Sequence, residues 1–227
     1  MRKQLAAMGV STVPAVVVDG VPMVSGFYDA RRLAGALNLG PDAWGLPPPR
    51  PPERRQQFMA DLDLVANATA DAARLVPASR LDDRPEGDFW SLRELAYHSF
   101  AFNNRVRRAV AFDEPMTWDR LNAYIEECKQ FATPGAIVDA GLTLHGEFKT
   151  WFVGDDEAVW AETLETHSGE QRAEDMLFFA LGHMAFHLVQ LYHYLDLLGV
   201  TGFTRLNEAR LLAMDEPTPI GSGTDLN

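Results

Sequence analysis

Apolar residues recur every three or four positions through four long stretches of this chain, the pattern of amphipathic helices. Ser91 followed three residues later by Glu94 forms a capping box, which marks a helix start. Thr133 with Pro134 marks a second start, and Gly199 marks a helix end. Long helices are predicted at residues 53–75, from 91 onward, from 133 onward and at 173–198, with a shorter one at 118–131. We therefore expect a mainly α protein built as an up-down four-helix bundle.

A proline-rich segment divides the sequence into two unequal parts. Residues 41–53 read PDAWGLPPPRPPE, and six prolines in so short a stretch disfavour both a helix and a central strand. We predict a small N-terminal unit at 1–40, a linker at 41–53, a helical domain at 54–213 and a disordered polar tail at 214–227.

The N-terminal unit has the pattern of a β-hairpin between two helices. Asp19 and Gly20 separate the apolar runs 15–18 and 21–24, and Asp-Gly between two such runs is typical of a tight hairpin turn. Short helices are predicted on either side, at 2–8 and 28–37. About 40 residues are too few to bury a stable core, so we expect this unit to pack against something else.

The overall charge excludes some partners. Lys and Arg number 20 against 32 Asp and Glu, and a net charge of −12 disfavours binding to nucleic acid or to anionic membrane surfaces. Cys128 is the only cysteine, so no internal disulfide forms and no CxxC motif exists. Pro14 and Asp19 interrupt the N-terminal apolar run, which disfavours a signal peptide, and no run approaches about 18 apolar residues. We expect a cytoplasmic protein.

Three histidines are the candidate chemistry of the chain. His183 and His187 are four residues apart in an apolar helical stretch, so their side chains should point the same way, one turn apart. His98 lies on the apolar face of another predicted helix and could complete a three-nitrogen site for a divalent metal ion. Imidazole suits zinc, nickel, iron and copper, of which we expect zinc or nickel. Three protein ligands leave a position for water or substrate, as in catalytic sites.

Other polar residues have simpler explanations. Two of six histidines can fall four apart by chance, and core histidines are common, so the spacing alone does not establish a site. His145 is expected in the core or at the surface, His193 is rotated away from the other two, and His167 falls in a polar connection. Gln190 could orient a ligand or fill a core gap. Cys128 lies among carboxylates, which disfavours a reactive thiolate.

Residues 54–199 resemble the DinB-like family of four-helix metalloproteins. In that family the second helix opens on Trp-Ser and carries a histidine up to two turns later, as Trp90, Ser91 and His98 do here. The last helix of the family carries HxxxH, two further residues, Gln-Leu and finally Leu-Gly. The matching residues here are His183, His187, Gln190, Leu191, Leu198 and Gly199.

The resemblance implies a metal site at His98, His183 and His187, and a role with low-molecular-weight thiols. Bacillithiol transferases and mycothiol-dependent isomerases are members of the family. Leu188 and Val189 replace the usual Arg-Gly pair, which removes a charge and puts the substrate in question. We expect a metal-dependent thiol transferase or hydrolase acting on a small electrophile. The alternative is a non-enzymatic, metal-stabilised binding or dimerisation module, and a homodimer is expected in either case.

The N-terminal unit, residues 1–40, resembles the second half of a glutaredoxin, which has a thioredoxin fold. The resemblance rests on Thr12-Val13-Pro14, the following strand and turn, and a later Ser-Gly with Asp29. It implies that Val13 and Asp29 contact a bound thiol peptide and that Pro14 shapes the turn as a cis proline. An ordinary trans proline is the other interpretation. The front of a glutaredoxin, with its reactive cysteine, is missing, so either the natural start lies upstream or the segment is a remnant.

Overall fold

The computed structural model of the protein describes residues 15–18, 21–25, 52–85, 90–152, 157–166 and 169–214. The chain divides into two compact units, and the larger one spans Arg50–Glu216. The thiol contacts predicted at Val13, Pro14 and Asp29 lie outside the described residues, as do His167 and the tail beyond Met214.

The smaller unit contains two short strands where the sequence predicts them. Strands β1 (Ala15–Val18) and β2 (Val21–Ser25) pair antiparallel, with Val18 opposite Val21. The register shifts between Val16 and Val17, opposite Pro22, which has no backbone N–H to donate to the ladder. The Asp-Gly turn between the strands lies outside the described residues.

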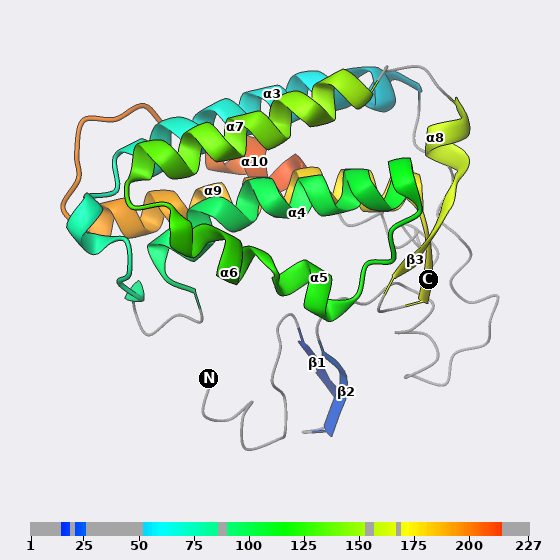
Figure 1. The fold of residues 1–227 in the computed structure, drawn as a ribbon, viewed down its shortest axis with the longest axis horizontal. Coiled ribbons are helices and arrows are strands. Elements are labelled where there is room, and N and C mark those ends of the chain that lie inside the picture. Colours follow the sequence, from blue (N-terminus) through cyan, green and yellow to red (C-terminus); the bar gives the residue numbers. More distant parts are fainter. Residues whose placement is uncertain are drawn as a thin grey trace, which may run out of the picture. The chain divides into compact units, whose positions relative to one another are not determined.

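Four long helices form the larger unit, and each packs against two of the others around an apolar core (Figure 1). Helices α3 and α4 both pack against α7 and α9, with α3 and α4 only in marginal contact. The bounds agree with the predicted helices to within about one turn. They are α3 (Pro52–Arg74), α4 (Leu92–Phe112), α7 (Pro134–Trp151) and α9 (Ala173–Leu197).

The capping residues seen in the sequence fix these helix ends. The Ser91 hydroxyl accepts a hydrogen bond from the Glu94 backbone N–H at 3.2 Å, and the Glu94 carboxylate accepts one from the Ser91 N–H at 2.7 Å. This reciprocal pair satisfies two of the free donors at the start of α4. At the start of α7 the Thr133 hydroxyl accepts from the Ala136 N–H. Gly199 follows α9 with a φ of 73°, a left-handed conformation that glycine adopts without strain.

The order of helix directions differs from the expected up-down arrangement. Phe100 meets Gly141, and seven residues further along α4 the Arg107 guanidinium pairs with Glu147 at 2.6 Å, so α4 and α7 run parallel. A crossover carries the chain back to the end where α4 began (Figure 1). It consists of α5 (Trp118–Asn122), α6 (Tyr124–Glu127) and the 3-10 turn η3 (Cys128–Gln130), where the sequence predicts one helix. The prediction of a simple up-down order is therefore wrong at this connection.

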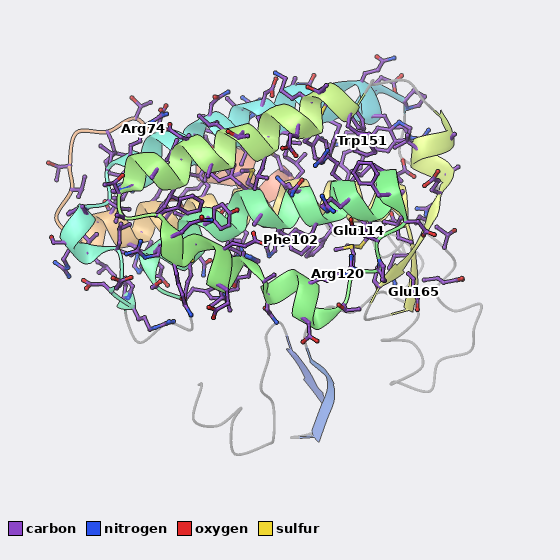
Figure 2. All side chains as sticks on the ribbon, viewed as in Figure 1. Arg74, Phe102, Glu114, Arg120, Trp151 and Glu165 are labelled. Atoms are coloured by element: carbon purple, nitrogen blue, oxygen red, sulfur yellow. The ribbon has the colours of Figure 1, made fainter. Side chains whose placement is uncertain are left out.

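The start of the crossover is held by backbone conformation and charge. Asp113 ends α4 with a φ of 54°, a left-handed conformation that turns the chain out of the helix. The Glu114 carboxylate then pairs with Arg108 of α4 and with Arg120 of α5 (Figure 2). These contacts hold the first part of the crossover against the end of α4.

Several short elements were not predicted. Strands β3 (Thr163–Thr166) and β4 (Gly169–Arg172) pair antiparallel in a stretch that reads as a polar connection. The others are η1 (Ala78–Arg80), α8 (Glu157–Ala161) and α10 (Glu208–Met214). Helix α10 packs against α9 through the fully buried Leu211, so ordered helix extends through Met214. None of the described helices combines the length and the apolar character needed to cross a membrane.

Aromatic side chains make the core at the end of the unit where α3 and α9 begin. The Phe58 ring lies 5.2 Å from Phe178 and 5.6 Å from Trp160 of α8, both edge-on. Phe148 and Phe152 complete the cluster at 6.2 and 5.3 Å from Phe58. Such aromatic pairs add about 0.5–1.5 kcal/mol each beyond burial. This cluster fixes α3, α7, α8 and α9 relative to one another at this end of the unit.

Candidate metal centre

Three imidazole rings from two helices converge in the larger unit. His98 lies in the second turn of α4, and His183 and His187 lie one turn apart on α9, which runs antiparallel to α4. One ring nitrogen from each histidine can be chosen so that the three lie within 4.8 Å of one another. The Nε2 atoms of His183 and His187 are 3.1 Å apart. In the described part of the chain, this is the only group of three or more potential ligands that approach so closely.

The three rings are withdrawn from solvent. His98 is 5 % exposed and His187 is 3 % exposed, while His183 is half-buried. Neither ring nitrogen of His98 has a hydrogen-bond partner among the described residues. An unpartnered buried polar group costs about 1–3 kcal/mol. A ligand that accepts the lone pair of His98 would remove part of this cost, so the ring fits a metal-binding role.

Burial also sets the protonation state of the cluster. It lowers the pKa of the His98 and His183 imidazoles well below their usual value, because a charged ring would be separated from water. The neighbouring His187 lowers both pKa values further, because two positive rings at this distance repel. The His98 and His183 rings are therefore neutral at physiological pH. Neutral imidazole is the form that binds metal ions.

The spacing of the nitrogens fits a small divalent cation. Metal–nitrogen bonds of about 2.0–2.1 Å in tetrahedral geometry place two ligand nitrogens roughly 3.3 Å apart. The observed 3.1 Å between His183 and His187 is close to that value. No pair of the chosen nitrogens exceeds 4.8 Å, so His98 would need only a small side-chain adjustment.

Two aromatic rings from outside α4 and α9 pack directly on the histidines. The indole of Trp90, which precedes α4, lies 4.5 Å from the His98 ring and 4.8 Å from the His187 ring. Tyr124 of α6 lies on His98 at 4.2 Å and is almost fully buried. Burial raises the pKa of the Tyr124 phenol, and the nearby Glu94 carboxylate adds to the effect, so the hydroxyl stays protonated. These walls place the histidines in a medium of low polarity, where electrostatic interactions are stronger than in water.

One side of the cluster approaches the surface of α9. Phe102 lies 4.3 Å from the His183 ring and Phe179 lies 5.5 Å from it, with both ring planes tilted by 36°. Phe186 packs edge-on against His187 at 5.5 Å and is 44 % exposed. Phe179, His183 and Phe186 follow one another along the helix at helical spacing. A small molecule reaching the histidines from this side would first meet aromatic surface.

Gln190 contacts the cluster from the next turn of α9. Its side-chain oxygen is 2.6 Å from Nδ1 of His187, a hydrogen-bond distance. The sequence left open whether Gln190 orients a ligand or fills a gap in the core. This contact favours the first interpretation, because a hydrogen bond to one ring nitrogen determines which nitrogen carries the proton.

The remaining candidates lie away from the cluster. His145 Nε2 bonds to Asp63 of α3 at 2.7 Å, which joins α7 to α3, and His193 is exposed. Cys128 is buried, and burial raises the pKa of its thiol to about 11, so it is not a thiolate at neutral pH. Leu188, at the position of the family's arginine, is fully buried.

Sequence reasoning missed Tyr124 as a neighbour of His98. Tyr124 belongs to α6, a short helix of the crossover, and the apolar pattern of so short a helix does not predict which part of α4 it packs against. Trp90 was identified as part of a helix-start motif, but its contact with two histidines could not be read from that motif.

Comparison with known proteins supports the family resemblance. The sequence profile of the DinB superfamily matches residues 61–191, which is more than half of the chain. No curated protein matches the sequence. Two solved structures are similar in fold: the mycothiol-dependent maleylpyruvate isomerase and a point mutant of it, each 18 % identical with a TM-score of 0.49. The similarity covers 63 % of this chain and 61 % of each of those chains, so this chain spans less than two thirds of their length.

Proposed function

Because the chain belongs to the DinB superfamily, we propose that it is a four-helix-bundle metalloprotein that uses its metal to activate a small thiol or water. His98, His183 and His187 would hold one divalent ion, with zinc or nickel expected from the donor set. The nucleophile would then attack a small electrophile, either transferring the thiol or hydrolysing the substrate. The reaction class rests on the family resemblance, and the ligand set rests on the geometry of the three rings.

The state of His98 is the observation on which the metal site depends most. Its two ring nitrogens are buried without a hydrogen-bond partner among the described residues, and its ring lies 4.9 and 5.0 Å from the rings of His183 and His187. A histidine kept only for packing would be expected to bond to a backbone or side-chain group. Two imidazoles on α9 and one on α4 instead face one another, as ligands of a shared ion do.

The surroundings of the histidines fit a catalytic role. A divalent ion held by three imidazoles lowers the pKa of a coordinated water or thiol and supplies a nucleophile at neutral pH. Trp90, Tyr124 and Phe102 exclude bulk water from the rings and hold their orientation. The protonated Tyr124 hydroxyl remains a potential hydrogen-bond donor beside His98. Phe179 and Phe186 offer an apolar approach to the centre.

Metal analysis of the purified protein tests the ligand set. The wild-type protein should retain one divalent ion per chain after gel filtration, and a His98→Ala variant should lose it. The matched control is His193→Ala, which removes an exposed imidazole from the same helix as His183 and His187. Metal content equal to that of wild type in the His98→Ala variant, with correct folding shown by circular dichroism, would refute the proposed centre.

A second assay separates an enzyme from a binding module. Thiol consumption is measured with a panel of small thiols and a reactive aromatic chloride or epoxide, using metal-loaded wild type and the His98→Ala variant. The enzyme hypothesis predicts turnover that depends on both the thiol and the ion. If the protein binds one metal ion per chain but catalyses neither thiol transfer to the electrophile nor its hydrolysis, the result would favour the non-enzymatic module.

A further inference from the structure

The structure assigns Gln190 the role of a positioning residue that fixes the tautomer of His187, an inference that rests on the metal centre proposed above. Gln190 lies one turn beyond His187 on α9 and is half-buried. Its Oε1 atom is 2.6 Å from Nδ1 of His187. This is a specific polar contact, formed by the ring nitrogen other than the one that contacts His183.

The chemistry of the two groups determines the proton position. An amide oxygen only accepts hydrogen bonds, so the Nδ1 atom of His187 must donate the proton in this contact. When this ring is neutral it carries only that one proton, so its Nε2 atom carries a lone pair and can accept a hydrogen bond or bind a metal ion. That Nε2 atom is the one that lies 3.1 Å from His183. Gln190 therefore presents the lone pair of His187 toward the point where the three histidines meet.

The contact between the two α9 histidines is consistent with this assignment. Two nitrogens 3.1 Å apart share a hydrogen bond only if one of them carries a proton. With a neutral His187 ring, Nε2 of His187 is the acceptor and Nε2 of His183 is the donor in the absence of metal. A cation that takes both lone pairs would replace this shared proton, while the bond to Gln190 would remain unchanged. The His187 ring is thus already oriented and in the correct tautomer before metal binds.

Three substitutions separate positioning from simple packing. Gln190→Met keeps the length and volume of the side chain but removes the acceptor, whereas Gln190→Glu keeps an acceptor at the same reach. Gln130→Met, at an exposed position on η3, is the matched control. If Gln190 only fills space, the Met variant should have the same His187 tautomer and the same zinc affinity as wild type. If it positions His187, the Glu variant should behave like wild type and the Met variant should not.

The first measurement reads the tautomer directly in the metal-free protein. Nitrogen-15 shifts of His187 should show a proton on Nδ1 in wild type and in Gln190→Glu, and a mixture of tautomers in Gln190→Met. A proton on Nε2 in the wild-type protein would overturn the inference, as would an unchanged tautomer in Gln190→Met. This readout needs no metal, so it judges the role of Gln190 independently of the proposed function.

The second measurement is zinc affinity, determined by competition with a chromophoric chelator. Removing a partner that orients a ligand typically weakens metal binding by 10–100-fold, so Gln190→Met should lose affinity by roughly that factor. Gln190→Glu and Gln130→Met should stay close to wild type. Equal affinity of Gln190→Met and wild type, while His98→Ala has lost the metal, would overturn the inference and leave the metal centre standing. Failure of wild type to bind zinc or nickel would instead overturn the proposed function.

Discussion

A single glycine controls how closely α4 and α7 approach, and replacing it gives a quantitative test of the fold. A Cβ atom added at Gly141 would lie 2.6 Å from Cγ and 2.8 Å from Cε2 of the Phe100 ring, and nearer still to Cδ2. Phe100 is almost fully buried, and Cγ is the first ring atom, so the ring cannot swing away without moving α4. Gly141→Ala should therefore force the two helices apart or push Phe100 out of its rotamer.

The expected size of the effect comes from two opposing contributions. Alanine favours a helix over glycine by about 1 kcal/mol. Overpacking a well-filled core costs about 1–3 kcal/mol. Gly146 lies on the same helix, and a Cβ there would meet nothing within 4 Å. Gly146→Ala should therefore stabilise the protein by up to about 1 kcal/mol, and the difference between the two variants should be about 1–3 kcal/mol.

Urea unfolding followed by circular dichroism measures this difference. For a domain of this size each 1 kcal/mol corresponds to roughly 2–4 °C in Tm, so thermal unfolding should place Gly141→Ala clearly below Gly146→Ala. Equal stability of the two variants would refute the close approach of α4 and α7 at Phe100. It would also remove one of the two contacts that show these helices to be parallel.

Two further predictions concern buried charge at other sites of the larger unit. Arg55→Met removes the guanidinium 2.9 Å from the buried carboxylate of Glu174, while Arg172 remains 3.8 Å from that carboxylate. Urea unfolding should show that the free energy of unfolding falls by about 3 kcal/mol. A decrease below about 1 kcal/mol would contradict a tight buried pair. Burial lowers the pKa of His145, although the neighbouring Asp63 carboxylate opposes the shift. The unfolded state therefore binds a proton at this residue more readily than the folded state does. The protein should lose stability as the pH falls below about 6.5, the ordinary pKa of histidine. His145→Gln should abolish this pH-dependent loss, so the free energy of unfolding of the variant should fall less than that of wild type between about pH 7.5 and 5.5. An identical pH dependence of stability in the two proteins would count against a lowered pKa of His145.

The ends of the long helices could be predicted because short-range chemistry determines them. Ser91 and Glu94 form their capping box within one turn of chain, and Gly199 adopts its left-handed conformation regardless of distant contacts. The convergence of the α9 histidines likewise follows from a spacing of four residues. That His98 joins them was predicted from the apolar face of its helix, and the structure brings the three rings together.

Features that depend on distant contacts could not be predicted in this way. The parallel course of α4 and α7 depends on the crossover, whose direction is set at Asp113 and by the pairing of Glu114 with Arg108 and Arg120. Strands β3 and β4 are short and polar, so their pairing leaves little trace in the hydrophobic pattern. The ring of Tyr124 reaches His98 from another element, and no local rule connects the two.

The crossover separates the elements that hold the three histidines from the element that covers them. The long helices supply the histidines, whereas the short α6 supplies Tyr124, which borders them without belonging to that framework. Connecting segments vary in sequence and length more readily than the elements they join, although the Tyr124 ring itself is almost fully buried. A change in the path of this segment would therefore alter what covers His98 without moving the three histidines, because these are held by the long helices.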